Sequence, residues 1–152
     1  MRKIVLLVLM LALLLIVGCY RTGYIPNELS NTIPQNENGN FILYVSNFSK
    51  AIDPVDINVE IDGECFVNGL FPVDPGGPVV QPRKFQFLLP DGMHIVKVKS
   101  VKGKEVIEQQ IEIKGNHWAI IDYVGPEATG KGGKPLLENL FFRIQDKPIL
   151  FL

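Results

Sequence analysis

The sequence predicts an all-β fold: an antiparallel sandwich of seven to eight strands, preceded by a signal peptide and a flexible tether. Three observations lead to this prediction. Apolar and polar residues alternate with a period of two in several segments after Phe41, which is the pattern of half-buried strands. Turn residues separate these segments at intervals of about 8 to 15 residues, as in sandwiches. No window has the period of a helix, and about 110 residues suffice for one core.

The first predicted strands begin the domain and form a hairpin. The segment FILYVSN (41–47) is the first strand. In VDINVEI, apolar side chains such as Val55 and Ile57 alternate with polar ones, so one face points to a core. Asp62 and Gly63 supply the hairpin turn, because glycine tolerates a positive φ, and CFVNGLF returns.

The rest of the domain repeats the pattern of short strands and turns, after a loop rich in proline and glycine from Pro72 to Pro82. The further predicted strands are KFQFLL (84–89), HIVKVKSV (94–101), EVIEQQIEI (105–113), HWAIIDYV (117–124) and ENLFFRI (138–144), and the chain finishes on PILFL (148–152). The predicted sandwich domain therefore spans residues 41–152.

Residues 1–18 have the composition of a signal peptide. Two basic residues precede fourteen apolar ones, Ile4–Val17, which is shorter than the ~20 that a membrane-spanning helix needs. The end of this run and the two residues after it, Ile16 to Cys19, resemble a bacterial lipobox, in which small residues precede a cysteine that receives a diacylglycerol. The resemblance implies a lipoprotein whose mature chain begins at acylated Cys19. The alternative is an uncleaved N-terminal anchor with an incidental cysteine.

The lipobox resemblance also implies a membrane partner, reached through the lipid anchor. Each buried lipid methylene contributes about 0.8 kcal/mol, so several acyl chains give lasting attachment. Position 20 is Tyr20, not the aspartate that retains some lipoproteins at the inner membrane. We therefore expect a lipid-anchored protein of the cell envelope, at the outer membrane if the cell has two membranes.

Residues 19–40 contain the lipidated cysteine and a predicted flexible tether. The segment 20–40 is rich in Asn, Pro, Gly, Ser and Thr and lacks an apolar period. A coil of about 20 residues reaches roughly 25 Å, which would hold a small domain clear of lipid headgroups. The alternative is that its asparagine-rich part forms an edge strand.

Charge and cysteine content exclude several classes of function. Removal of residues 1–18 takes away two of the 15 basic residues and none of the 16 acidic ones, which leaves a net charge of −3. This mildly acidic chain has no basic patch, so we expect no nucleic-acid partner. Once Cys19 is acylated, only Cys65 remains. We therefore predict no intrachain disulfide and no thiolate metal cluster, with Cys65 packed as a small apolar residue.

Part of the domain resembles the carboxypeptidase-regulatory, transthyretin-like and PEGA-type modules of envelope proteins. The shared pattern is V-x-I-D-G at 59–63, F-x-F-x-L at 85–89 and P-x-G-x-H-x-I/V-x-V at 90–98. The resemblance implies an immunoglobulin-like or transthyretin-like sandwich with an accessory role. It covers less than half of the domain, lacks the tetrapeptide that names the PEGA module, and transfers no functional residue.

The segment VGPEATGKGG comes within one residue of a nucleotide-binding loop. Gly125, Gly130 and Lys131 have the spacing G-x-x-x-x-G-K after an apolar run. However, Gly132 stands where serine or threonine would hold magnesium, and a Gly-Gly-Lys-Pro sequence is a poor helix start. The sequence therefore predicts no nucleotide binding and no cofactor.

The two histidines, His94 and His117, do not form a recognisable catalytic or metal motif. The sequence contains no G-x-S-x-G, no H-E-x-x-H and no paired-histidine spacing. Both histidines lie in predicted strands, so we interpret them as structural. We predict no catalytic residues and no enzymatic activity.

Aspartates recur at the predicted turns: Asp53, Asp56, Asp62, Asp74 and Asp91. Loops at one end of a sandwich converge, so Asp53 and Asp56 could bind calcium together with another loop. Aspartate is also a common turn residue, and no dense D-x-D-x-D loop is present. We favour the turn role and predict no metal site.

Four aromatic residues, Tyr44, Phe48, Trp118 and Tyr123, allow two interpretations. Flat rings on one surface would form a platform for glycans, whereas aromatics within Ile/Val-rich strands usually fill the core. We favour the core and expect Trp118 between the two sheets.

The leading hypothesis is a lipid-anchored, non-enzymatic β-sandwich that acts as a binding or assembly module, with an envelope protein as its partner. The second is a small exported hydrolase, or its inhibitor, with a site built from loops. The third is a surface module that binds carbohydrate or calcium. A long unpaired edge strand would favour the binding of a protein partner. A deep pocket with ionisable groups would favour the hydrolase, and an exposed aromatic strip would favour the glycan-binding module.

Overall fold

A computed structural model describes residues 33–74, 82–126, 128–129 and 139–151. These residues form eight strands: β1 (Phe41–Asn47), β2 (Val55–Ile61), β3 (Glu64–Phe71), β4 (Arg83–Phe87), β5 (Gly92–Ser100), β6 (Glu105–Ile113), β7 (His117–Tyr123) and β8 (Leu140–Gln145). Each lies where the alternation of apolar residues predicts a strand. Within the described residues no helix is long and apolar enough to span a membrane.

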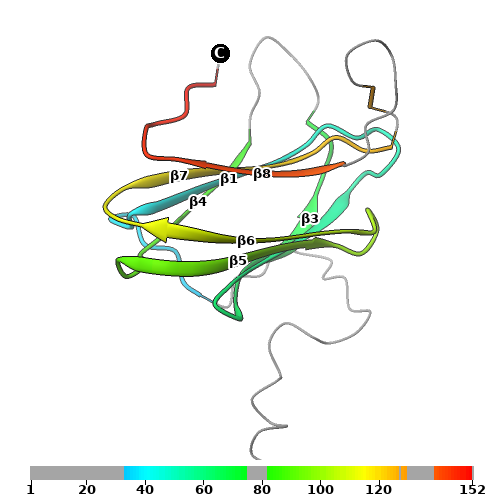
Figure 1. Ribbon diagram of the computed structural model, residues 1–152. Coiled ribbons are helices and arrows are strands. Elements are labelled where there is room, and N and C mark those ends of the chain that lie inside the picture. The colour runs from blue at the N-terminus through cyan, green and yellow to red at the C-terminus, as the bar shows by residue number, and fades with distance from the viewer. Residues whose placement is uncertain (1–32, 75–81, 127, 130–138, 152) are drawn as a thin grey trace, which may run out of the picture.

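The strands form two facing sheets, as Figure 1 shows. One sheet has the order β4-β1-β7-β8 and the other β3-β2-β5-β6. All pairs are antiparallel except β1 with β7, which run parallel with Phe41 opposite His117. The predicted all-β sandwich is therefore confirmed, with one parallel pair. A period of two reports which side of a strand is buried and carries no information on strand direction.

The core lies between the two sheets and is built from the inward residues of both. Aromatic rings fill much of it, and Phe66 meets Phe87 edge to face at 5.0 Å between ring centroids. The largest fully buried side chains are Tyr123, Phe41, Phe71, Phe85, Phe87, Leu43, Ile57 and Ile61. The predicted alternation in residues 85–89 is confirmed, since Phe85, Phe87 and Leu89 are all buried.

Trp118 does not lie between the sheets, so that prediction is wrong. In β7 the buried residues are Ala119, Ile121 and Tyr123, which places Trp118 and Ile120 on the opposite, outer face of the sheet. Both phases of this strand are apolar, so the alternation alone does not decide which side faces the core. Trp118, the largest side chain of the strand, is therefore among those that face outward.

A buried amide at the end of β1 ties three segments together. Asn47 donates from Nδ2 to the carbonyls of Ile52, at 3.1 Å, and Phe71, at 3.0 Å. Its Oδ1 accepts from the backbone N–H of Ser49 at 2.9 Å. Because each polar atom of this side chain has a partner, its burial carries no unpaired group.

The end of the predicted tether belongs to the domain. Residues 33–40 run beside β4, where Asn36 N donates to Gln86 O at 2.8 Å and Gln86 Nε2 donates to the Glu37 and Gly39 carbonyls at 2.9 Å. These residues cover the exposed edge of β4 without forming a strand. The ordered domain therefore begins before Phe41. Residues 1–32 lie outside the described residues.

Gly39 allows this close approach, and we predict that Gly39→Ala destabilises the domain. A Cβ at this position would lie 2.2 Å from the carbonyl oxygen of Phe87, so the backbone must move. We expect a loss of about 1–3 kcal/mol in the free energy of unfolding, measured by urea denaturation. Asn38→Ala, at an exposed position in the same turn, is the control and should change it by less than about 0.5 kcal/mol. Equal stability of both variants would contradict the proposed packing.

Candidate binding groove

The outer face of the β4-β1-β7-β8 sheet carries polar side chains within an apolar surface. Parallel pairing places Ser46 of β1 opposite Asp122 of β7, and Tyr44 opposite Ile120. On the other side of β7, Arg143 of β8 is opposite Ile120. Since side chains of one parity share a face, these residues gather on the side that faces away from the core.

The C-terminal segment 148–151 lies over this outer face. In Figure 1 it is the red segment that continues from β8 and rises above the sheet. The ring of Phe151 contacts the ring of Tyr44 edge to face, with centroids 4.8 Å apart. Leu150, in contrast, is 82% exposed. The segment therefore roofs part of the sheet and presents one aliphatic side chain to solvent.

A hollow of about 530 Å³, which we call the outer groove, lies between this segment and the sheet. Its volume is within the usual range for small-molecule sites, about 300–1,000 Å³. The lining residues are Ser46, Phe48, Ile120, Asp122, Arg143, Gln145, Pro148, Ile149, Leu150 and Phe151. Polar groups from three strands thus meet apolar side chains from the end of the chain.

An ion pair, Asp122 with Arg143, lines the outer groove. Arg143 Nη2 donates to Asp122 Oδ2 at 2.9 Å; the side chain of Asp122 is 17% exposed and that of Arg143 is 68% exposed. Burial raises the pKa of Asp122 above 3.8, although the hydrogen bond and the charge of Arg143 oppose this shift. The exposed guanidinium keeps further N–H donors for a ligand.

Ser46 is the polar group of the groove that lacks a full hydrogen bond. The residue is 4% exposed, and among the described residues its Oγ has no partner in full hydrogen-bond geometry. Burial raises the pKa of Asp122, and the Ser46 hydroxyl beside this carboxylate opposes that shift. Proximity without full hydrogen-bond geometry is a weak contact, so the hydroxyl retains capacity for a further partner. A buried hydroxyl of this kind is an uncommon feature that calls for a ligand or an ordered water.

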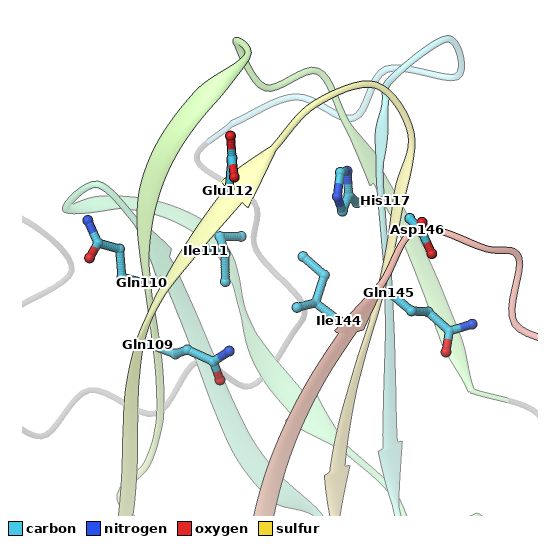
Figure 2. Close-up of a pocket in the computed structure, with 8 residues that line it drawn as sticks. All are labelled: Gln109, Gln110, Ile111, Glu112, His117, Ile144, Gln145 and Asp146. Carbon is cyan, nitrogen blue, oxygen red and sulfur yellow. The ribbon is translucent and has the colours of Figure 1, made fainter.

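A second hollow, of about 300 Å³, opens between β6 and β8 at the side of the sandwich. Figure 2 shows Ile111 and Ile144 pointing into it from the two sheets, with His117 and Asp146 on one side. The eight residues that line it include no serine, threonine or cysteine. His117 Nδ1 lies 3.3 Å from the Gly115 carbonyl. This cleft therefore combines a histidine and carboxylates with no nucleophile among its lining residues.

His94 has a structural position between two turns. Its Nδ1 lies 2.6 Å from Asp62 Oδ2 and its Nε2 lies 2.8 Å from the Pro90 carbonyl. Both partners are acceptors, so the doubly protonated ring satisfies both contacts. Burial lowers the pKa of His94, but the Asp62 hydrogen bond, the Pro90 carbonyl and the Asp62 charge outweigh it and raise the pKa above 6.5. The contact joins the β2–β3 turn to the start of β5.

The aspartates at turns are hydrogen-bond acceptors for nearby backbone. Asp56 accepts from Val101 N and Lys102 N at 2.8 Å each. Asp53 accepts from Val73 N at 2.8 Å, and Asp91 lies at 3.4 Å from Gly115 N. The described residues contain no group of three His, Cys, Asp or Glu side chains placed to hold a metal ion. Asp53 and Asp91 thus have the turn role that we favoured, whereas Asp56 lies within β2 and holds the turn that follows β5.

The four aromatic residues considered for a glycan platform do not share one location: one lies in the core and three lie at the surface. Tyr123 is fully buried, as the core interpretation predicts. Tyr44 and Trp118 lie on the outer face, and Phe48 is 38% exposed at the groove. Sequence reasoning missed Ser46, Asp122, Arg143 and Phe151. A signal was present for Asp122, since it is the one charged residue in an otherwise apolar strand after His117.

The near-match to a nucleotide-binding loop is described only in part. Gly125 follows β7 with a φ of 75°, and its carbonyl accepts from Ala128 N at 3.2 Å. Gly130 and Lys131 lie outside the described residues, and so does Cys19.

Cys65 is buried in its hairpin as predicted, but it is not a thiol. Its sulfur lies 3.6 Å from Asn58 Nδ2 and is part of a disulfide. The prediction of an unpaired Cys65 is therefore wrong. That prediction rested on the acylation of Cys19, which lies outside the described residues.

Comparison of the chain with protein-family models, with curated proteins and with solved structures found no match. The likeness to transthyretin-like and related modules therefore stays a prediction from the motifs, while the two-sheet sandwich is established by the strand pairing.

The His94–Asp62 contact predicts a pH-dependent contribution to stability. The raised pKa of His94 means that its contribution is complete below pH 6.5 and is lost as the pH rises through the folded-state pKa. Burial raises the pKa of Asp62, but hydrogen bonds to Ile95 and His94 lower it below 3.8, so its contribution is lost as the pH falls through that lower value. The stability difference between wild type and His94→Gln should be largest near pH 5 and smaller at pH 9. Urea denaturation at both values tests this, and a difference that grows toward pH 9 would contradict it.

Proposed function

We propose that this chain is a lipid-anchored, non-enzymatic binding module of the bacterial cell envelope and that the outer groove is its binding surface. The observation that carries the proposal is the groove itself. An open hollow of about 530 Å³ combines an ion pair, a buried unsatisfied hydroxyl and apolar side chains. Polar groups that converge beside apolar side chains in one hollow are a usual composition of a binding site.

The anchoring part of the proposal rests on residues 1–19. The short basic and apolar segment ends in Ile16-Val17-Gly18-Cys19, and cleavage before Cys19 would leave an acylated N-terminus. The lipid would attach the domain to the envelope membrane, at the outer membrane in a cell with two.

The arrangement of the ionisable groups supports a binding role over a catalytic one. Asp122 is engaged by Arg143, and His94 is held between Asp62 and Pro90. His117 lies in the cleft whose lining offers no hydroxyl or thiol. Hydrolysis by a nucleophile and a base requires both groups within hydrogen-bond reach. The second hollow has no nucleophile among its lining residues, and in the outer groove the carboxylate beside the Ser46 hydroxyl is engaged by Arg143.

Lipidation predicts that the mature protein loses its signal peptide and gains mass at Cys19. In cells fed a clickable fatty acid, the wild-type chain should be labelled and Cys19→Ser should remain unlabelled and unprocessed. Intact-mass spectrometry of the wild type should show cleavage before Cys19 and an acylated N-terminus. Persistent label in Cys19→Ser, or a wild-type chain with an unmodified N-terminus, would overturn the anchoring proposal.

The groove proposal is tested by site-specific photo-crosslinking in intact cells. A photoreactive residue in place of Leu150, at the rim of the groove, should give adducts with an envelope component. The matched control is Val106, an exposed aliphatic residue on β6 of the opposite sheet. We expect at least tenfold more adduct from position 150. Equal yields at the two positions would contradict the assignment of the groove as the binding surface.

A further inference from the structure

Resting on this proposed function, we propose that the ligand of the outer groove is a neutral saccharide. Its hydroxyls would be held by Ser46, Asp122 and Arg143, and its C–H face would lie against an aromatic ring that flanks these groups, Phe48 or Phe151. The polar groups, the apolar side chains and the place of the groove in the sheet each support this class of ligand.

The polar groups of the groove offer both donors and acceptors. Asp122 is an acceptor, Arg143 carries N–H donors beyond the one at 2.9 Å, and Ser46 Oγ has no full hydrogen bond among the described residues. A sugar hydroxyl donates one hydrogen bond and accepts others, as a serine hydroxyl does. Neighbouring hydroxyls of one sugar ring therefore match this mixture. Satisfying the Ser46 hydroxyl would remove the cost of leaving a buried polar group unpaired.

The opposite charges of Asp122 and Arg143 favour a neutral ligand. Asp122 and Arg143 carry opposite charges with donor and acceptor 2.9 Å apart. An anion that approaches Arg143 also meets the carboxylate, and a cation that approaches Asp122 also meets the guanidinium. A neutral polyol meets neither repulsion and forms charge-assisted hydrogen bonds with both groups.

The apolar side chains of the groove suit the C–H face of a sugar ring. Phe48 is 38% exposed, and Phe151 lies in the roof of the groove against Tyr44. The face of an aromatic ring is electron-rich, so it attracts the weakly positive C–H groups of such a ligand. Ile120, Ile149 and Leu150 complete the apolar surface. A ligand with both an apolar face and a hydroxyl-bearing edge would use the polar and the apolar side chains of the groove at once.

The position of the groove argues against an extended peptide as the occupant. Ser46 and Asp122 lie on β1 and β7, the two central strands of their sheet, and each of these strands pairs with a neighbour on both sides. Strand addition requires unpaired backbone groups at a sheet edge. The floor of the groove therefore offers a peptide side-chain contacts only. The envelope protein expected from the sequence remains the competing occupant.

The experiment is a titration of the ¹⁵N-labelled protein with neutral oligosaccharides, followed by NMR. The probes are chitotriose, maltotriose, cellotriose and mannotriose, each raised to 10 mM, and an Ala/Ile hexapeptide tests the competing class. We expect one saccharide to shift amides at residues 44–48, 118–122 and 143–151. Arg143→Met and Ser46→Ala should each weaken its binding at least tenfold.

Lys84→Met is the matched control, because Lys84 is exposed on the same sheet but does not line the groove. It should leave the saccharide affinity unchanged. Four outcomes would overturn the inference: amide shifts confined to the opposite sheet, no shift with any saccharide, equal losses of affinity in Lys84→Met and Arg143→Met, or binding of the hexapeptide alone.

If cross-linking from position 150 succeeds while all saccharides fail, the saccharide inference is wrong and the binding module stands. If both fail, the proposed function is wrong as well.

Discussion

The parallel pairing of β1 with β7 is the interaction on which both the core and the groove depend. It joins the first strand of the domain to the next-to-last one, with Phe41 opposite His117 and Asn47 opposite Tyr123. On the inner face, this register packs Phe41 and Leu43 beside Ala119 and Ile121 in the core. On the outer face, the same register brings Ser46 beside Asp122. A shift by one residue would move each set to the wrong face.

The buried polar groups of the domain fall into two kinds. Asn47, Asp56 and His94 are each held by two or more hydrogen bonds, and each connects a strand end to a neighbouring turn. Such satisfied groups are expected in any well-packed domain. Ser46 and Asp122 differ from them, because the hydroxyl is unpaired and the carboxylate has a raised pKa that Arg143 only partly offsets. An incompletely satisfied pair beside a hollow is the arrangement expected where a ligand completes the contacts.

The sequence predicts the strands well where only one phase of the alternation is apolar. In β2, Val55 and Ile57 face the core while Asp56 and Asn58 take the other side, so the facing of the strand follows directly. In β7 both phases are apolar, and the expectation for Trp118 was therefore wrong. The sequence of each strand also carries no local signal that β1 and β7 pair in parallel, since this pairing follows from how the two sheets close around the core. Ser46, Asp122 and Arg143 come from three distant segments, so their meeting depends on that long-range pairing.

Hydroxyl-radical footprinting of the full-length protein in native envelope membranes tests the central claim, that the outer face of the β4-β1-β7-β8 sheet is the binding surface. The measurement compares side-chain oxidation in membranes with oxidation of the purified protein. Our account predicts severalfold protection of Phe48 and Leu150 at the groove, with Met93 and Ile95, exposed on the opposite sheet, oxidised at unchanged rates. Protection of Met93 and Ile95 with no change at Phe48 and Leu150 would contradict it.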